Sequence, residues 1–264
     1  MQLQFPITRA SSEDLLWSLS RTFNSEKPNL ILDISALPRE LAAYMLDILI
    51  ANHEHKKFAA LFESIYVVVT SPKRLSDRRS IAPFSVGNPR FLYKDLQLER
   101  DKTRTTALIF PGSEGFEAQS VVDSLIGAES DIFVALDHEC FSFPNALSTA
   151  VSNQTLINSW LQEELKIRHY FNPEDILRIG DEIIEHAIDK AKKYPDDRHQ
   201  LLVAPFGAKI NLLMGASIRA NYLKRVDAAS VDTDVIILPH FQYVSLYSRG
   251  SKISRLFKLG YETT

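Results

Sequence analysis

The sequence predicts an α/β fold built on one mostly parallel sheet of about six strands. Short apolar runs alternate along the chain with longer segments of helical periodicity. The runs are short and rich in β-branched residues, which is typical of strands buried on both faces. The 264 residues are 45% hydrophobic and 24% charged, values ordinary for a globular chain that buries a full core.

Six apolar runs are expected to form the strands. They are residues 29–34, 65–70, 105–110, 131–136, 201–204 and 234–238. The segment 71–80 is basic and polar, and either a solvated loop or a phosphate-contacting loop explains it. Residues 81–104 contain Pro83, Gly87 and Pro89 and are expected to be loop with a short strand at 90–93.

Helical periodicity fills most of the intervals between these runs. Helices are expected from residue 11 onward and at 40–61, 118–126, 146–165 and 173–193. The sequence Asn172-Pro173-Glu174-Asp175 is a strong start signal, with proline early and acids in the first turn. Residues 144–194 look helical almost throughout. We therefore expect a single domain, 1–264, that carries a helical insertion at 144–194.

Charge and composition narrow the classes of function. The net charge of −3 argues against a general nucleic-acid coat or an anionic-membrane binder, but it leaves room for a local basic pocket. The single cysteine, Cys140, excludes an internal disulfide and a cysteine-cluster metal site. The sequence shows no signal-peptide pattern and no apolar run of the roughly 20 residues that span a bilayer. A cytoplasmic protein that does not contact membranes is expected.

The stretch Gln200–Tyr222 carries the main functional signal. An apolar run leads into a turn around Gly207, and a helix follows in which Lys209 and Asn211 come early. The first amides of a helix lack partners within the helix, and the helix dipole favours an anion there. We therefore expect Gly207, Lys209 and Asn211 to bind a ligand. A tight strand-to-helix turn with an exposed lysine is the alternative, since the P-loop and dinucleotide motifs are both absent.

A second glycine turn follows the run 105–110. Gly112 and Ser113 lie in the sequence Pro-Gly-Ser-Glu-Gly before a predicted helix. Backbone amides in such a turn can hold phosphate, so both residues are candidate ligand contacts. An ordinary turn in which Phe116 anchors the packing is the alternative.

Further polar residues follow the other apolar runs, where an open parallel sheet places its ligands. Asp33, Ser35 and Arg39 follow the first run, Asp137 follows the fourth, and His240 and Tyr243 follow the last. We expect the ligand to be bound by Asp33, Ser35, Asp137, His240 and Tyr243 as well as by the glycine turns. Asp33 and Asp137 fit either a Mg²⁺ or acid–base pair or two caps of the helices that follow.

No complete catalytic or metal motif appears. The Gly-x-Ser-x-Gly nucleophile motif and the His-Glu-x-x-His metal motif are both missing from the sequence. No catalytic residue, metal or cofactor is therefore assigned.

The turn Phe206-Gly207-Ala208-Lys209, with Met214 further along the helix, resembles the second signature of the CARF domains, the CRISPR-associated Rossmann folds. In that family a Gly-Gly-Thr-Lys turn occupies this place, so Phe206 and Ala208 depart from it. The resemblance implies a Rossmann-like fold, usually dimeric, and an oligonucleotide messenger bound by Gly207 and Lys209. The segments 33–39, DISALPR, and 115–117, GFE, are also similar to turns in Rossmann-like components of prokaryotic defence loci.

Three functions follow from these observations. The leading hypothesis is a non-catalytic Rossmann-like sensor, or a subunit of a larger assembly, that recognises a nucleotide or phosphate. The second is a Mg²⁺-dependent enzyme that acts on a nucleotide or phosphorylated metabolite through Asp33 or Asp137 with Lys209. The third is a structural interaction subunit. A homo-oligomer or membership of a larger complex is expected in each case.

Overall fold

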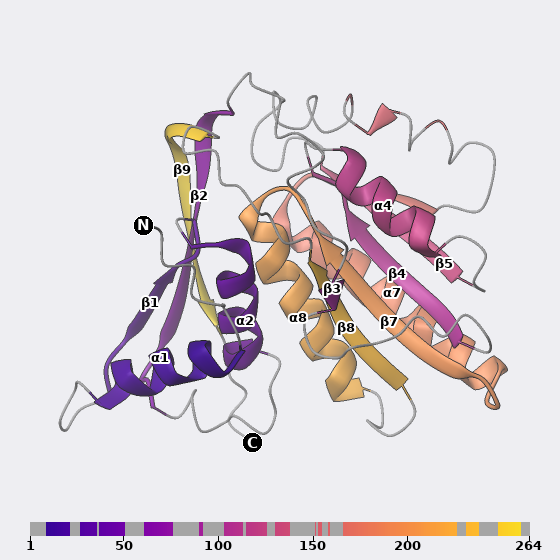
Figure 1. Cartoon of the computed structure of the whole chain (residues 1–264), viewed down its shortest axis with the longest axis horizontal. Helices are drawn as coiled ribbons and strands as arrows, with labels where there is room; N and C mark the ends of the chain where they lie inside the picture. Colours follow the sequence, from indigo (N-terminus) through magenta and orange to yellow (C-terminus); the bar gives the residue numbers. More distant parts are fainter. Residues whose placement is uncertain are drawn as a thin grey trace, which may run out of the picture.

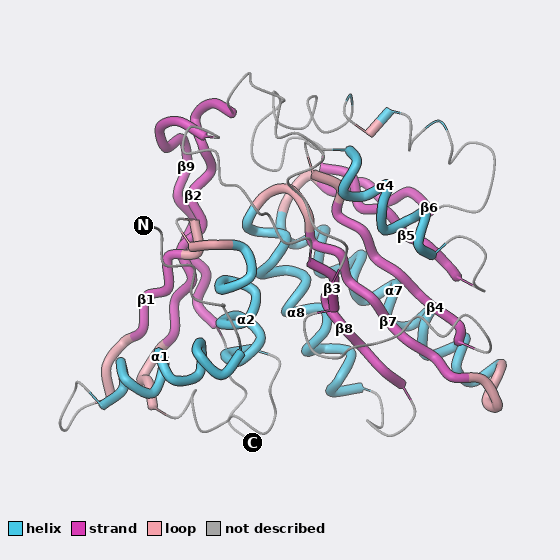
Figure 2. Tube along the Cα trace, in the orientation of Figure 1, coloured by secondary structure: helices cyan, strands magenta, loops and turns pink. Residues whose placement is uncertain are grey.

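The computed structural model describes only part of the chain. The described residues are 9–21, 27–35, 37–50, 61–75, 90–91, 103–112, 115–125, 130–137, 151, 153–154, 158, 166–225, 231–237 and 248–259. They form a mixed α/β structure with two sheets (Figures 1 and 2). The α/β prediction is confirmed at this level. The larger sheet has six strands, but the first two predicted strands lie in the smaller sheet, so the assignment of all six apolar runs to one sheet is wrong.

The larger sheet has the strand order β3-β8-β7-β4-β5-β6. Its strands are β3 (Arg90–Phe91), β4 (Thr103–Phe110), β5 (Ser130–Asp137), β6 (Lys166–Tyr170), β7 (Arg198–Pro205) and β8 (Val231–Ile237). Every pairing from β8 across to β6 is parallel, whereas β3 pairs antiparallel with β8 at the edge. The apolar runs predicted as third to sixth strands therefore lie together, as expected.

The smaller sheet has the order β1-β2-β9 and contains the first two predicted strands. The strands are β1 (Leu30–Asp33), β2 (Ile65–Leu75) and β9 (Ser248–Leu259). β1 pairs parallel with β2, and β9 pairs antiparallel along the whole of β2. The β2 strand continues through residues 71–75, which were expected to belong to a loop. The strand β9 has 12 residues and is not among the six apolar runs predicted as strands.

The order in which successive strands are added to the larger sheet reverses between β4 and β7. From β4 it passes through α4 (Gly115–Leu125) to β5 and on to β6. The helix α7 (Pro173–Lys193) then returns it to the other side of β4, where β7, α8 (Lys209–Arg225) and β8 follow. Strands β4 and β7 are neighbours whose following helices lead toward opposite edges of the sheet.

The two faces of this sheet are covered by different helices. Alternate residues of β4 show the division, since Ala107 and Ile109 pack with α4 while Leu108 and Phe110 belong to the core that includes α7 and α8. Side chains of a strand alternate between faces, so both faces must be apolar to be covered in this way. This explains why the strand appeared in the sequence as a continuous apolar run.

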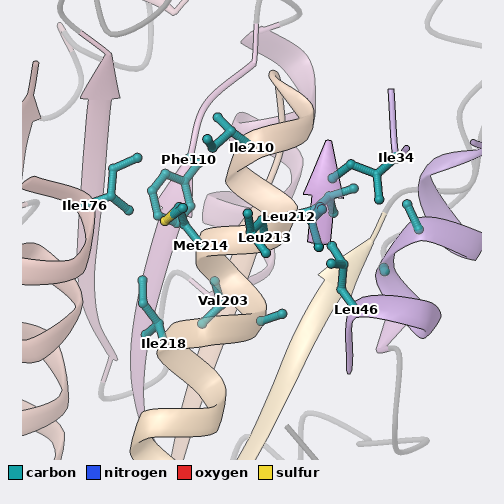
Figure 3. Close-up of a cluster of buried hydrophobic side chains, with 14 of the residues drawn as sticks. Ile34, Leu46, Phe110, Ile176, Val203, Ile210, Leu212, Leu213, Met214 and Ile218 are labelled. Atoms are coloured by element: carbon teal, nitrogen blue, oxygen red, sulfur yellow. The ribbon is translucent and has the colours of Figure 1, made fainter. Parts of the chain in front are cut away.

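Helix α8 lies between the larger sheet and the helix α2 (Arg39–Ile50) beside the smaller sheet. Figure 3 shows Leu212 beside Ile34 and Leu46 on one side of α8, and Met214 near Phe110 on the other side. Most of the α8 residues are buried. The two sheets and α1 (Arg9–Arg21) therefore share one continuous hydrophobic core with α8 at its centre.

The segment 144–194 contributes to the sheet and is not purely helical. Residues 166–170 form the edge strand β6, parallel to β5. The helix predicted after Asn172 is confirmed as α7, and the Asn172 side chain accepts a hydrogen bond of 2.9 Å from the Asp175 amide, as an N-cap does. Most of the helix predicted at 146–165 lies outside the described residues. Among the helices that the structure describes, none combines the length and apolarity needed to cross a membrane.

Candidate functional site

The candidate site is formed by two turns that follow neighbouring strands. Pro111–Gly112 follows β4 and leads toward α4, and Phe206–Ala208 follows β7 and leads into α8. We call these segments the paired turns. The register of β4 and β7 places Phe110 beside Pro205, so the two turns leave the sheet side by side. The sequence predicted both turns as ligand contacts, and the structure brings them together.

The contact between the paired turns depends on Gly207. Its φ of +74° lies in the left-handed region that favours glycine. A Cβ atom at this position would lie 3.0 Å from the Cα of Gly112 and 3.2 Å from the carbonyl oxygen of Pro111. Because these neighbours are backbone atoms, they have little room to move away. Gly207 is therefore required both by its conformation and by the approach of the other turn.

Asn211 holds the second turn from beneath. Its side-chain amide donates a 2.7 Å hydrogen bond to the Phe206 carbonyl, and its Oδ1 accepts a 3.4 Å hydrogen bond from the Tyr170 hydroxyl. The residue is only 2% exposed. The prediction that Asn211 contacts ligand is not supported by this geometry, which instead gives the side chain a positioning role. Its burial on the first turn of α8 was not visible in the sequence.

Asn153 supports the other turn, and the sequence did not single it out. Its side-chain nitrogen donates a 2.8 Å hydrogen bond to the carbonyl of Gly112, and the residue is 1% exposed. No local pattern signals this contact, because Asn153 lies 41 residues away in a segment predicted to be helical.

Two cations from different parts of the chain lie beside the second turn. The guanidinium of Arg39 donates hydrogen bonds of 2.6 Å to the carbonyls of Pro205 and of Gly207. The ammonium of Lys209 donates to the carbonyl of Leu37, in the loop before α2. These bonds join the loop after β1 to the turn after β7, so the loops at the carboxyl ends of strands from both sheets meet here.

The pKa of Lys209 reflects this environment. Burial, with a smaller contribution from the positive charge of Arg39, lowers it to about 7. In the sequence, Arg39 follows the first apolar run. No local pattern indicates that it belongs to the candidate site, since a basic residue at a helix start is usually solvated. Its pairing with Lys209 required the tertiary structure.

Asp33 and Ser35 lie at the end of β1 in the smaller sheet. The Asp33 carboxylate accepts a 2.9 Å hydrogen bond from the Ser35 amide, and the Ser35 hydroxyl accepts one of 2.7 Å from the Thr70 amide. Both side chains thus shape the loop that carries Leu37 and Arg39. Asp137 ends β5 in the other sheet, so the two aspartates considered as a Mg²⁺ or acid–base pair do not end neighbouring strands.

The remaining predicted ligand contacts are not placed by the structure. Ser113, His240 and Tyr243 lie outside the described residues, as does the side chain of Asp137. Within the described part of the chain, no group of three or more histidine, cysteine, aspartate and glutamate side chains has an arrangement that would hold a metal ion.

A separate polar cluster lies on the larger sheet beside α7. The Asp131 carboxylate contacts Lys190 at 2.6 Å, His186 at 2.9 Å and Lys166 at 3.4 Å. Burial acts to raise the pKa of Asp131, but the hydrogen bonds from Lys190 and His186 and the nearby lysine charges outweigh it and hold the pKa well below its usual range. Asp131 is the second residue of β5 and lies at the opposite end of the strand from the paired turns, so this cluster joins β5, β6 and α7 without contributing to the candidate site.

Comparison with known proteins identifies no relative. No family model matches the chain, and no curated protein or solved structure matches it either. The geometry of the described residues therefore carries the functional argument.

Proposed function

We propose that this chain is a Rossmann-like, non-catalytic protein that recognises a nucleotide or another phosphate-bearing ligand at the paired turns. The observation that carries the proposal is the contact between Gly207 and Gly112, at the point where the strand order of the larger sheet reverses. A sensor, or a recognition subunit of a larger assembly, is the role that fits such a site.

The strand order supports this class of fold. Numbered by appearance from β4, the parallel strands β6-β5-β4-β7-β8 have the order 3-2-1-4-5. Doubly wound nucleotide-binding sheets have this order, and they bind ligands outside the carboxyl ends of the strands where the order reverses. In this chain that point lies between β4 and β7, which is where the paired turns are found.

The two helices that follow the turns favour an anion. The first amides of a helix lack acceptors within the helix, which leaves those of Lys209 and Ile210 directed toward the turn. The amide of Asn211 instead donates a 2.9 Å hydrogen bond to the Ala208 carbonyl. The helix dipoles of α4 and α8 place partial positive charge at their first residues. A phosphate group beside the turns would accept hydrogen bonds from such amides. α8 begins directly after the second turn, and α4 begins three residues after Gly112.

The cations beside the second turn provide further support. Arg39 and Lys209 both donate to neutral backbone carbonyls, and their mutual repulsion contributes to the lowered pKa of Lys209. An anion bound near them would replace this repulsion with attraction. Binding of a phosphate would therefore raise the pKa of Lys209 and take up protons near neutral pH.

Thermal-shift and calorimetric titrations test the proposal. Nucleotides, cyclic oligonucleotides and inorganic phosphate serve as probes, because a ligand that binds only the folded state raises the melting temperature. Lys209→Ala should abolish the shift, while Lys209→Arg should retain part of it. Lys224→Ala, which removes an exposed lysine at the other end of α8, is the matched control. The absence of any shift with the wild-type protein would contradict the proposal.

The enzyme alternative receives no specific support. It requires Asp33 or Asp137 to act with Lys209. The Asp33 carboxylate accepts a hydrogen bond from the Ser35 amide, and the Lys209 ammonium donates to the Leu37 carbonyl. Dimerisation, a role in prokaryotic defence and a cytoplasmic location stay predictions from the sequence.

A further inference from the structure

The strands β2 and β9 form a long antiparallel ribbon that is separate from the paired turns. The two strands pair along their whole length, from Ile65 with Leu259 to Leu75 with Ser248. One bulge, beside Ser71 and Pro72, shifts the register. The strand β1 pairs only with the first four residues of β2. Among the described strands, the rest of the ribbon is therefore two-stranded, and Figure 1 shows it extending beyond β1 at the edge of the molecule.

The charge of this ribbon differs from that of the rest of the chain. Its 23 residues contain six basic residues and no acidic residue. The basic residues are Lys73, Arg74, Arg249, Lys252, Arg255 and Lys258. The remainder of the chain carries 24 lysines and arginines against 33 aspartates and glutamates. The ribbon is thus a local basic element on an otherwise acidic protein, which the net charge of −3 conceals.

The register places like charges opposite one another. Arg74 pairs with Arg249 across the ribbon, and like charges at directly opposed positions destabilise a sheet. Charged residues on edge strands do prevent edge-to-edge aggregation. That purpose favours lysine, but it does not require two arginines at register positions that oppose each other. An anionic partner lying along the ribbon explains both the absence of acids and the opposed arginines.

We propose that the ribbon of β2 and β9 binds duplex DNA through the phosphate backbone, with the two strands entering the major groove. A major groove about 12 Å wide admits a two-stranded β-ribbon. Tyr66 and Arg74 are eight residues apart on β2 and so occupy positions of the same face, with Lys258 and Arg249 as their register partners. Because β1 flanks Tyr66, the part of β2 that can enter the groove runs from Val69 to Leu75, about 20 Å at the usual rise of a strand. This length spans several phosphates, and Lys258 would contact phosphates beside the groove.

The polar groups described on that face are compatible with a nucleic-acid surface. The hydroxyls of Thr70 and Ser254 bond each other at 2.9 Å in an exposed position, and the Lys258 ammonium lies 5.9 Å from the centre of the Tyr66 ring. DNA binding here would be independent of ligand binding at the paired turns.

Fluorescence anisotropy with a labelled 20-base-pair DNA duplex tests the proposal on the full chain. Binding by the wild-type protein is expected to weaken about 100-fold between 50 and 200 mM salt if about four phosphates are neutralised. The variant Arg74→Gln/Arg249→Gln/Lys258→Gln should bind at least tenfold more weakly, with a shallower salt dependence. The matched control Lys192→Gln/Lys193→Gln/Lys224→Gln removes three exposed cations from α7 and α8 and should bind like wild type.

Two further measurements separate groove binding from loss of folding and from general attraction to polyanions. The variant Arg74→Lys/Arg249→Lys keeps the charge and should retain binding. Because this variant changes the same two positions, retained binding would show that the weaker binding of the glutamine variant reflects lost charge contacts and not loss of folding. An RNA duplex of the same length should bind more weakly, because its deep, narrow major groove does not admit the ribbon. The proposal is overturned if wild type shows no salt-dependent DNA binding, if the control variant loses as much as the ribbon variant, or if duplex RNA or anionic vesicles bind more tightly than DNA.

Discussion

Gly207 and Gly112 are in backbone contact across the boundary between two βα units. A side chain on Gly207 would place its first carbon 3.0 Å from the Gly112 Cα, and the positive φ of Gly207 adds a conformational restriction. The position of both turns therefore depends on a residue without a Cβ. This relationship defines the candidate site, and its consequences are measurable.

Replacing Gly207 with alanine is expected to destabilise the protein by about 1–3 kcal/mol, because the new Cβ meets backbone atoms and the left-handed conformation is strained. Urea unfolding measures the change. Lys224→Ala, at an exposed position in the last turn of α8, should alter the free energy of unfolding by no more than about 0.5 kcal/mol. Equal stabilities of Gly207→Ala and wild type would show that the turns can separate without cost.

The stability of the ligand-free protein should rise with pH between about 7 and the usual pKa of lysine, near 10.4. The pKa of Lys209 is lowered to about 7 in the folded state, so in this interval the unfolded chain binds more protons than the folded chain. Stability rises with pH wherever this is so, and the penalty for keeping Lys209 charged is fully present below pH 7. Urea unfolding at several pH values should show a smaller slope for Lys209→Met than for wild type.

The control for this pH dependence is Lys224→Met, which alters an exposed lysine on the same helix. Its free energy of unfolding should follow the wild-type curve as the pH changes. Parallel curves for Lys209→Met and wild type would contradict the assignment of this pH dependence to Lys209.

The ion pair between Asp47 on α2 and Arg219 on α8 links the two sheets through their helices. The Asp47 residue is 2% exposed, and its carboxylate accepts a hydrogen bond from Arg219. Asp47→Ala should cost about 3–5 kcal/mol, because it leaves the arginine charge largely buried without this carboxylate. The double variant Asp47→Leu/Arg219→Met should lose much less. A double-mutant cycle in urea checks the coupling, and additive losses would rule it out.

Gly180 allows α7 to approach α8 closely. A Cβ there would lie 2.5 Å from the Cγ1 of Ile218. Gly→Ala within a helix usually stabilises by about 1 kcal/mol, but Gly180→Ala is expected to destabilise because Ile218 is buried and must shift. In an Ile218→Ala background, which removes the clashing atoms, the same change should recover the usual gain. Thermal unfolding of the four proteins tests this expectation, and destabilisation in both backgrounds would contradict it.

The sequence alone was sufficient for the elements whose signals are local. The apolar run that ends near Ala204, the glycine turn and the helix that begins at Lys209 were recognisable because strand length, turn chemistry and helical periodicity are properties of neighbouring residues. The start of α7 after Asn172 was predictable for the same reason. The convergence of loops at the ends of strands also followed from the general rule for parallel sheets.

Only the tertiary structure decided which strands share a sheet and which side chains meet. An apolar strand shows that it is buried but not which strand lies beside it, so the run at 29–34 was assigned to the wrong sheet. The meeting of Arg39 with Gly207, separated by 168 positions, and of Asn153 with Gly112 leaves no local pattern. The basic ribbon was hidden because its two strands lie at distant positions in the chain. Neighbouring residues determine whether a segment forms a helix, strand or turn. A site formed by long-range contacts also depends on how these elements pack together, which no short segment of the sequence determines.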